Sequence, residues 1–266
     1  MTDPVILVDI NHRGVATVAL NRPAVNNAYD GALIDALAAG LVRLAATSGL
    51  RLVVLRGNGK YFQAGADLAY LRHLSAAPAA ENLEFSRATV AAVDALWNFP
   101  CPTIALVHGG CFGGGVGLVA ACDMAVASAD AVFSLTEVRW GITPAPVIPV
   151  LVAAIGPRAL GRYGLTAERF GAAEALRLGL VHAVCPEGGL DEAAAPLIEG
   201  VLMAAPEAVA VTKRLVRETA GSDTTPEFRD MLAREAAARR HAAEAREGLA
   251  SFAEKRKPSW YPGEGG

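Results

Sequence analysis

The sequence predicts an α/β fold, in which stacked or parallel strands are joined by helices, followed by a helical C-terminal region. Two observations lead to this prediction. Short apolar strand patterns alternate with longer segments of helical spacing up to about residue 195, as crossover connections require. Beyond that point the chain has charged, Ala-rich helical segments and nothing typical of a strand. We therefore divide the chain into residues 1–195 and residues 196–266.

The first half of the chain gives an expected element for nearly every apolar run. Apolar residues alternate on both sides of Arg13-Gly14, which predicts an antiparallel hairpin. Leucines at helical spacing from Leu33 to Leu44 predict a helix over 30–47. The elements expected after it are a strand at 50–56, a loop at 57–65, a helix at 81–97, a strand at 103–107, a glycine run, a helix at 116–121, and short strands at 124–127 and 131–134.

The pattern becomes helical beyond Pro144. A helix is expected over 172–178, ended by Gly179 as a C-cap, and the last strand is expected at 180–184. Charged, Ala-rich helices are expected over 206–219 and 226–253. Because these helices lack enough apolar residues for a core of their own, they pack on the preceding domain or on another subunit, or remain a solvated pair.

The composition argues against several classes of partner. The chain has 266 residues, with 24 Lys plus Arg against 27 Asp plus Glu and a formal charge of −3. Such a balance gives no general attraction to nucleic acid or to an anionic membrane. The first residues lack the pattern of a secretory signal, so we expect a cytoplasmic protein. The four cysteines have no CxxC pair and no His at metal-ligand spacing, which favours buried thiols over disulfides or a zinc site.

Two long uncharged stretches raise the question of a membrane span. Residues 95–122 contain two prolines and six glycines, and residues 140–157 contain four prolines. An uninterrupted helix facing lipid would lose backbone hydrogen bonds at these positions. Both stretches are therefore expected to form the buried interior of a soluble protein.

A glycine run at 109–117 is the densest signal for chemistry. It lies between an expected strand and an expected helix, where free amides can donate to an anion or to a polarised oxygen. Close helix packing would require glycines equally well. Gly115-x-Gly117-x-x-Ala120 also fits a dinucleotide fingerprint, with Glu137 near the place of a ribose-binding acid, although the run lies far from the first strand of the domain.

Two further segments could carry chemistry. Residues 59–68 follow a strand and end in a small-residue tip, where Asp67 is expected to cap a helix. Residues 133–141 place Glu137 among apolar residues. Taken alone, Glu137 could be an active-site acid, but the residues themselves slightly favour a salt bridge between Glu137 and Arg139.

These segments, in this order and spacing, resemble the crotonase family of enoyl-CoA hydratases and isomerases. The resemblance covers essentially the whole chain and implies a spiral ββα core with a C-terminal helical region. The matching segments are Asn21-Arg22-Pro23, Ala64-Gly65-Ala66-Asp67, the glycine run ending in Ala121-Cys122-Asp123, Glu137 with Gly141, Leu165-Thr166-Ala167, and Phe252-x-x-Lys255-Arg256-x-Pro258.

The resemblance implies an acyl-CoA thioester as the substrate. By the same resemblance, the backbone amides of Ala64 and Gly114 would form an oxyanion hole for the thioester oxygen, and Glu137 would be the acid/base. The loop formed by Ala64, Gly65, Ala66 and Asp67 would cradle coenzyme A, whose phosphates would meet Arg22, Lys60 and, from a neighbouring subunit, Lys255. The thioester carries the activation, so no metal or redox cofactor is expected, and coenzyme A is part of the substrate. The family habit implies a trimer or a dimer of trimers.

One position departs from the family pattern. Two-carboxylate hydratases carry a Glu in the glycine-run helix, where this chain has Gly117. A single carboxylate can add water by a syn route or can move a double bond, so hydratase and Δ3,Δ2-enoyl-CoA isomerase both remain open. Residues 135–145 and 154–170 resemble methylglutaconyl-CoA and isohexenylglutaconyl-CoA hydratases, which favours hydration of a branched or dicarboxylic chain. A non-catalytic acyl-CoA binding protein is the remaining alternative.

Overall fold

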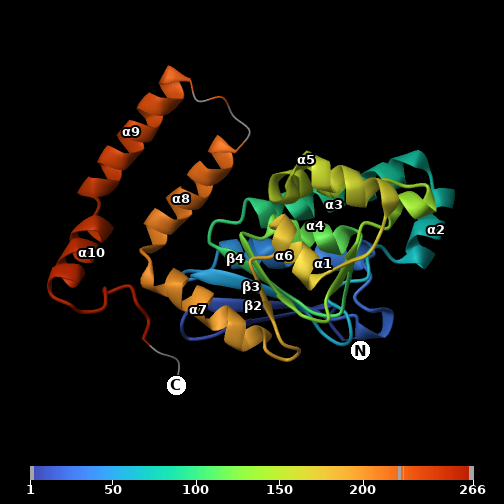
Figure 1. The fold of residues 1–266 in the computed structure, drawn as a ribbon, viewed down its shortest axis with the longest axis horizontal. Coiled ribbons are helices and arrows are strands. Elements are labelled where there is room, and N and C mark those ends of the chain that lie inside the picture. Colours follow the sequence, from blue (N-terminus) through green and yellow to red (C-terminus); the bar gives the residue numbers. More distant parts are fainter. Residues whose placement is uncertain (1–2, 221–222, 224, 264–266) are drawn as a thin grey trace.

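The computed structural model describes residues 3–220, 223 and 225–263. A sheet of six strands, in the order β1-β2-β3-β4-β6-β9, forms its centre (Figure 1). β1 and β2 are antiparallel, as the hairpin pattern predicts, and every other neighbouring pair in this sheet is parallel. The strands are β1 (Ile6–Ile10), β2 (Val15–Leu20), β3 (Leu52–Gly57), β4 (Thr103–Val107), β6 (Met124–Ser128) and β9 (Ala183–Cys185).

A second, smaller sheet stands beside the first. It has the order β5-β7-β8, formed by β5 (Gly110–Phe112), β7 (Val132–Ser134) and β8 (Phe170–Gly171). β5 follows β4 after a short turn and β7 follows β6 in the same way, so the chain passes repeatedly between the two sheets. This repeated passage is the spiral of strands and helices that the resemblance implied.

Ten α-helices and three short 3₁₀ helices connect the strands in the described part of the chain. The α-helices are α1 (Gly31–Ala45), α2 (Leu68–Ala76), α3 (Ala79–Trp97), α4 (Gly114–Ala121), α5 (Ile148–Thr166), α6 (Ala172–Leu178), α7 (Leu190–Met203), α8 (Pro206–Thr219), α9 (Pro226–His241) and α10 (Ala243–Ala253). The 3₁₀ helices are η1 (Pro23–Val25), η2 (Glu137–Trp140) and η3 (Ala145–Val147).

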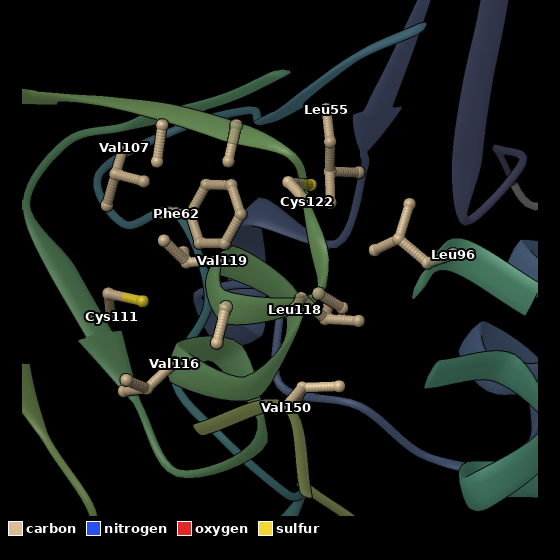
Figure 2. Close-up of a cluster of buried hydrophobic side chains, with 14 of the residues drawn as sticks. Leu55, Phe62, Leu96, Val107, Cys111, Val116, Leu118, Val119, Cys122 and Val150 are labelled. Carbon is tan, nitrogen blue, oxygen red and sulfur yellow. The ribbon is translucent and has the colours of Figure 1, made fainter. Parts of the chain in front are cut away.

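The large sheet buries apolar side chains on both faces, as parallel sheets do. Alternate residues of β3 divide between two clusters: Val53 and Leu55 pack with α1, α3 and α4, whereas Leu52 and Val54 pack with α7. Figure 1 accordingly shows α1, α3 and α4 on one side of the sheet and α7 on the other. Figure 2 shows the larger cluster, in which Val119 of α4 lies close to Phe62. α4 is thus held in the interior, with its N-terminus fixed in place.

Most predicted elements are confirmed to within a few residues. The strand at 103–107, the helix over 172–178 with its left-handed Gly179 cap, and the helix over 206–219 match their predicted bounds. The helix expected over 226–253 is wrong in one respect, because the chain turns at Ala242 and divides it into α9 and α10. The last strand lies at Ala183–Cys185, later than predicted.

The helix α7 was not predicted, and it changes where the core ends. Pro196 and Gly200 interrupt its helical pattern in the sequence. Residue 195, the expected boundary, lies inside α7, where Leu190, Ala194 and Leu202 are buried under the sheet. The layered core therefore extends to Met203, and the segment that stands apart is α8–α10 (Figure 1).

The helix α8 is fastened to the core by ion pairs. The Asp123 carboxylate accepts hydrogen bonds from Lys213 Nζ and Arg217 Nη2, each at 2.7 Å, and from the Thr103 backbone at 2.8 Å. Lys213 Nζ also donates to the Cys101 carbonyl at 2.8 Å. Because the three charged side chains are largely shielded from solvent, this contact fixes the direction in which the tail leaves the core.

The expectation for residues 140–157 requires a correction. Residues 95–122 are largely buried, but Trp140 is 60% exposed, and Ile142, Ile148 and Val152 are also exposed. The reason is that Trp140 and Ile142 face a cavity rather than a packed interior. Residues Ala145–Thr166 are long and apolar enough to span a membrane, yet Gly156 has φ 72° there and breaks the helical path before Pro157.

Candidate active site

A cavity of about 790 Å³ lies where α2, α3, η2 and η3 meet the start of α4. Three of the segments singled out in the sequence converge on it: the loop after β3, the glycine run and the segment around Glu137. The side chains and backbone groups that line it are Tyr29, Ala64, Ala66, Leu68, Leu71, Leu74, Ser75, Asn82, Phe85, Ser86, Thr89, Val90, Phe112, Gly113, Gly114, Thr136, Glu137, Trp140, Gly141, Ile142, Thr143, Pro144, Ala145, Pro146 and Val147.

The loop after β3 is held rigidly at the mouth of the cavity. Gly65 has φ 87°, a conformation that glycine adopts without strain, and its N–H donates to the buried Gln63 side chain at 2.9 Å. The Asp67 carboxylate accepts from the backbone of Ala69 and Tyr70, so it caps α2 as predicted. The loop also pairs with Tyr29, whose N–H donates to the Gly65 carbonyl at 2.9 Å.

The hydrogen bonds of this loop change which amide is available to a substrate. The Ala64 N–H donates to the Asn26 carbonyl at 3.0 Å, so the structure gives the expected oxyanion donor another partner. The Ala66 N–H makes no hydrogen bond within the described residues, and Ala66 lines the cavity. The available donor is therefore that of Ala66, two residues beyond the position implied by the resemblance.

The start of α4 supplies a second free amide. Gly113 has φ 53° and precedes the helix, and Gly114, as the first helical residue, has no intrahelical acceptor for its N–H. An added Cβ on Gly113 would lie 3.5 Å from the Gly65 Cα, so the two glycine turns are in contact. Ala66 and Gly114, which follow these two contacting glycines, both line the cavity.

Glu137 lines the cavity beside Gly113 and Gly114, and one of its carboxylate oxygens has no hydrogen-bond partner among the described residues. It begins η2, is 9% exposed, and its Oε2 atom is buried without a hydrogen-bond partner in the described structure. An added Cβ on Gly113 would lie 2.9 Å from Glu137 Oε1, which places the carboxylate against the glycine turn. Burial raises the pKa of Glu137 above its ordinary value.

The expected ion pair between Glu137 and Arg139 does not form. Glu137 is buried and Arg139 is exposed, and no salt bridge joins Glu137 to any described residue. η2 turns successive side chains in different directions, so neighbours in sequence need not meet. A buried, unpaired carboxylate in a cavity is a candidate general acid or base.

The position of the missing first carboxylate is filled by packing. A Cβ added to Gly117 would lie 2.1 Å from Val147 Cγ1 and 2.4 Å from Val147 Cβ. Val147 is buried and belongs to η3, which packs on α4. A Glu side chain at residue 117 therefore has no room unless η3 moves, and the site has one carboxylate among its described lining residues.

The same contacts explain the apparent dinucleotide fingerprint. A Cβ on Gly115 would lie 2.6 Å from Gln63 Oε1, and Gly117 is closed off by Val147. Both glycines are buried within α4. Their role is close helix packing, which leaves the nucleotide interpretation without support. Among the described residues, no three His, Cys, Asp or Glu side chains are placed to hold a metal ion.

The three basic residues expected near coenzyme A lie outside the cavity lining. Arg22 Nη2 pairs with Asp30 at 2.8 Å and with Asp67 at 3.6 Å, so it holds the end of the loop that follows β3. Lys60 lies over the Tyr61 ring and lines a separate polar cavity. Lys255 follows α10, at the end of the molecule opposite α2 in Figure 1.

The structure adds residues to the site that the sequence did not single out. Tyr29 lines the cavity between the loop and α4, and Phe85 stacks on it with ring centroids 6.3 Å apart. Val147 fills the space that a second carboxylate, at residue 117, would need. Neither residue belongs to a chemical motif; the signal for Tyr29 is its place six residues after the matching Asn21-Arg22-Pro23 segment.

Comparisons with known proteins identify the family of this chain. Residues 11–263 match the family described as enoyl-CoA hydratase/isomerase. A Thermus thermophilus protein provisionally named an enoyl-CoA hydratase is 36% identical over 95% of this chain and 99% of its own. Hydroxycinnamoyl-CoA hydratase-lyase of Pseudomonas fluorescens is 34% identical over 71% of this chain and 70% of its own.

A solved structure gives the same result for the fold. The enoyl-CoA hydratase of Shewanella pealeana superposes with a TM-score of 0.92 at 36% identity, covering 96% of each chain. This likeness confirms the predicted α/β fold with a crotonase-like core.

Proposed function

Because the chain belongs to the enoyl-CoA hydratase/isomerase family, we propose that it is an enoyl-CoA hydratase, which adds water to an α,β-unsaturated acyl-CoA thioester. One observation carries this proposal: the buried and unpaired carboxylate of Glu137 faces the same cavity as the free amides of Ala66 and Gly114. Such a site can both polarise a thioester carbonyl and transfer a proton next to it.

The proposed reaction needs only these groups and the substrate. The amides of Ala66 and Gly114 donate to the thioester oxygen. Glu137 takes a proton from water while the water oxygen bonds to the β-carbon, and the electron pair of the double bond moves to the thioester oxygen as an enolate. The enolate then takes the proton back from Glu137 at the α-carbon, so one water is added and Glu137 is regenerated.

Each group has a physical role in this sequence of steps. Removing one oxyanion donor typically costs about 3–4 kcal/mol of transition-state stabilisation. The raised pKa of Glu137 makes its carboxylate a stronger base than an ordinary Glu, and the carboxyl formed can return the proton. Coenzyme A enters as part of the substrate, and in this proposal the thioester supplies the activation that a metal or redox cofactor supplies elsewhere.

The cavity lining supports a neutral acyl chain. Apart from Glu137, every lining residue is uncharged, and most are apolar or aromatic. A distal carboxylate placed there would have no cation to pair with, and burying an unpaired charge is strongly unfavourable. Within the proposal, a branched neutral chain is therefore preferred over the dicarboxylic methylglutaconyl chain. The hydroxycinnamoyl group named for the Pseudomonas relative also carries no carboxylate at the end distal to coenzyme A.

A double-bond isomerase is the second candidate, and the contact between Gly117 and Val147 favours it. With one carboxylate, Glu137 could remove a proton from one carbon and return it to another without using water. A binding protein without turnover is the third candidate, since the same cavity could hold a thioester. The protein is proposed to act as a trimer or hexamer in the cytoplasm, where its four free cysteines fit a reducing compartment.

The test is a panel of thioesters in ordinary and ¹⁸O-labelled water, with products weighed by mass spectrometry. The matched pair is 3-methylcrotonyl-CoA and 3-methylglutaconyl-CoA, which differ by one carboxylate; crotonyl-CoA and a 3-enoyl-CoA complete the panel. Gain of one labelled water, faster with the neutral member, supports the proposal. A product of unchanged mass with a moved double bond would identify the isomerase, and binding without product would identify the binding protein.

The matching variant is Glu137→Gln. It should lower turnover by about 10²- to 10⁴-fold, the usual contribution of a general acid or base. Binding of a saturated acyl-CoA should be retained. Unchanged turnover would remove Glu137 from the mechanism.

A further inference from the structure

A phenol lies at the centre of the candidate site without an assigned partner. Tyr29 lines the cavity, and its hydroxyl makes no hydrogen bond within the described residues. Of the four other described tyrosines, Tyr163 donates to Glu174 and Tyr261 donates to Glu199. Tyr61, which packs on Phe112, and Tyr70, whose hydroxyl lies at Gly31, are not among the cavity-lining residues. Tyr29 therefore has a free donor directed at the place where substrate would bind.

The position of Tyr29 relative to the two free amides is defined on both sides. Its backbone pairs with the loop that follows β3, because the Tyr29 N–H donates to the Gly65 carbonyl and the Asp67 N–H donates to the Tyr29 carbonyl. Ala66 lies between these two hydrogen bonds. Its ring tip lies at the start of α4. An added Cβ on Gly114 would be 2.7 Å from Tyr29 Cε1 and 3.2 Å from its hydroxyl oxygen.

The surroundings keep this hydroxyl both fixed and protonated. Phe85 stacks on the ring, with an interplanar angle of 20°. Burial, together with the negative charge of Glu137, raises the pKa of Tyr29 to about 12. At neutral pH the group is thus a neutral phenol that can donate one hydrogen bond, held by the fold before substrate arrives.

We infer that Tyr29 is a catalytic residue whose hydroxyl donates a third hydrogen bond to the thioester oxygen, beside the amides of Ala66 and Gly114, as negative charge develops there. This inference rests on the proposed function. It assigns Tyr29 to the enolate and not to water, because its backbone pairs beside Ala66 and its ring tip lies at Gly114, whereas the place of a water-orienting carboxylate is closed by Val147.

The test separates formation of the enolate from addition of water. A saturated acyl-CoA, butyryl-CoA, can form the enolate through loss of an α-proton but cannot be hydrated. In heavy water, its α-proton exchange, followed by NMR, reports the enolate step alone. Tyr29→Phe keeps the stacked ring and removes the hydroxyl, and it should slow both hydration and exchange by the same factor, about 10- to 100-fold, with little change in KM.

Tyr70→Phe is the matched control. Tyr70 contacts the same Phe85 ring, with centroids 5.1 Å apart, but its hydroxyl lies at Gly31 and it is not among the cavity-lining residues. This variant should hydrate and exchange at the rates of the unaltered protein. Equal thermal melting of both variants would show that the fold is retained.

Three results would overturn the inference. Hydration slowed without any change in exchange would assign Tyr29 to water, and unchanged rates for both would leave it without a catalytic role. If Tyr29→Phe melts at a lower temperature, the ¹³C shift of the thioester carbonyl in bound butyryl-CoA decides: an unchanged shift excludes a hydrogen bond from Tyr29. A failure of the proposed function is distinguishable, because the unaltered protein itself would then show no hydration, whatever the effect of Tyr29→Phe on exchange.

Discussion

Glu137 carries a cost to stability that only its position in the fold reveals. The carboxylate is 9% exposed, and Oε2 has no hydrogen-bond partner among the described residues. A buried polar group left without a partner typically costs about 1–3 kcal/mol, and more if it is charged. The Glu137 carboxylate therefore destabilises the folded protein, as groups at functional sites often do.

The direction of this effect with pH follows from the raised pKa of Glu137. A carboxyl that is harder to ionise in the folded than in the unfolded protein destabilises the fold as pH rises through both pKa values. Glu137→Gln should consequently melt at a higher temperature than the unaltered protein at pH 7.5, by about 1 kcal/mol in unfolding free energy. This difference in unfolding free energy should shrink below pH 4.5, where Glu137 becomes protonated in the folded and in the unfolded protein.

Scanning calorimetry at pH 4 and pH 7.5 would check this prediction. Glu187→Gln, at an exposed position between β9 and α7, serves as the control for loss of one negative charge. An equal gain in both variants would point to general charge repulsion, and a loss of stability in Glu137→Gln would contradict the assignment.

At the scale of elements, the contact between α4 and η3 decides how many carboxylates the site contains. α4 is buried over nearly its whole length, and Val147 of η3 occupies the side of α4 on which Gly117 lies. Because interiors are packed without spare volume, neither element can yield to a larger side chain without displacing the other. The departure from the two-carboxylate pattern is thus a property of two packed elements and not of one residue.

Gly117→Ala tests this packing directly. Alanine favours a helix over glycine by roughly 0.5–1 kcal/mol, but here its Cβ would lie 2.1 Å from Val147 Cγ1. The overpacking should dominate and lower the free energy of unfolding by about 1–3 kcal/mol. Urea unfolding would measure it.

Gly161→Ala in α5 is the control, because nothing lies within 4 Å of an added Cβ there. This variant should be as stable as the unaltered protein or more stable. If Gly117→Ala behaves in the same way, η3 moves more freely than the packing implies.

At the scale of the whole molecule, the tail leaves apolar surface uncovered. α8–α10 extend away from the sheet, fastened mainly through Asp123 (Figure 1). Leu249 is 72% exposed and Phe252 is 86% exposed, both on α10. A cavity between α8, α9 and α10 is also lined largely by alanine, leucine and tryptophan. Exposed apolar surface of this kind favours association between chains.

We therefore expect the protein to sediment at three or six times its chain mass of 27.5 kDa. Replacing Leu249 and Phe252 together by glutamate should reduce the assembled fraction at least tenfold at micromolar concentration, because each change places a charge in an apolar contact. Asp230→Ala, on the exposed surface of α9, should leave the assembly intact. A single-chain mass for the unaltered protein would contradict the expectation.

The sequence by itself determined the class of fold and most of its elements. Periodicity and capping are local properties, so the strand at 103–107 and the helix ended by Gly179 could be predicted closely. The order of small residues around Ala64–Asp67 and Gly113–Gly117 also located the candidate site. The boundary predicted near residue 195 falls inside α7, a helix that Pro196 and Gly200 conceal in the sequence and that burial under the sheet stabilises.

Only the tertiary structure decided what each group in the site can do. Whether an amide or carboxylate is free depends on neighbours that are distant in sequence: Asn26 takes the amide of Ala64, and Val147 fills the space beside Gly117. Glu137 remains without the ion pair that its sequence neighbour Arg139 suggested, because η2 turns the two apart. The sequence determines which residue types are present. Packing determines their hydrogen-bond partners and the space around them, and therefore which groups are free to react.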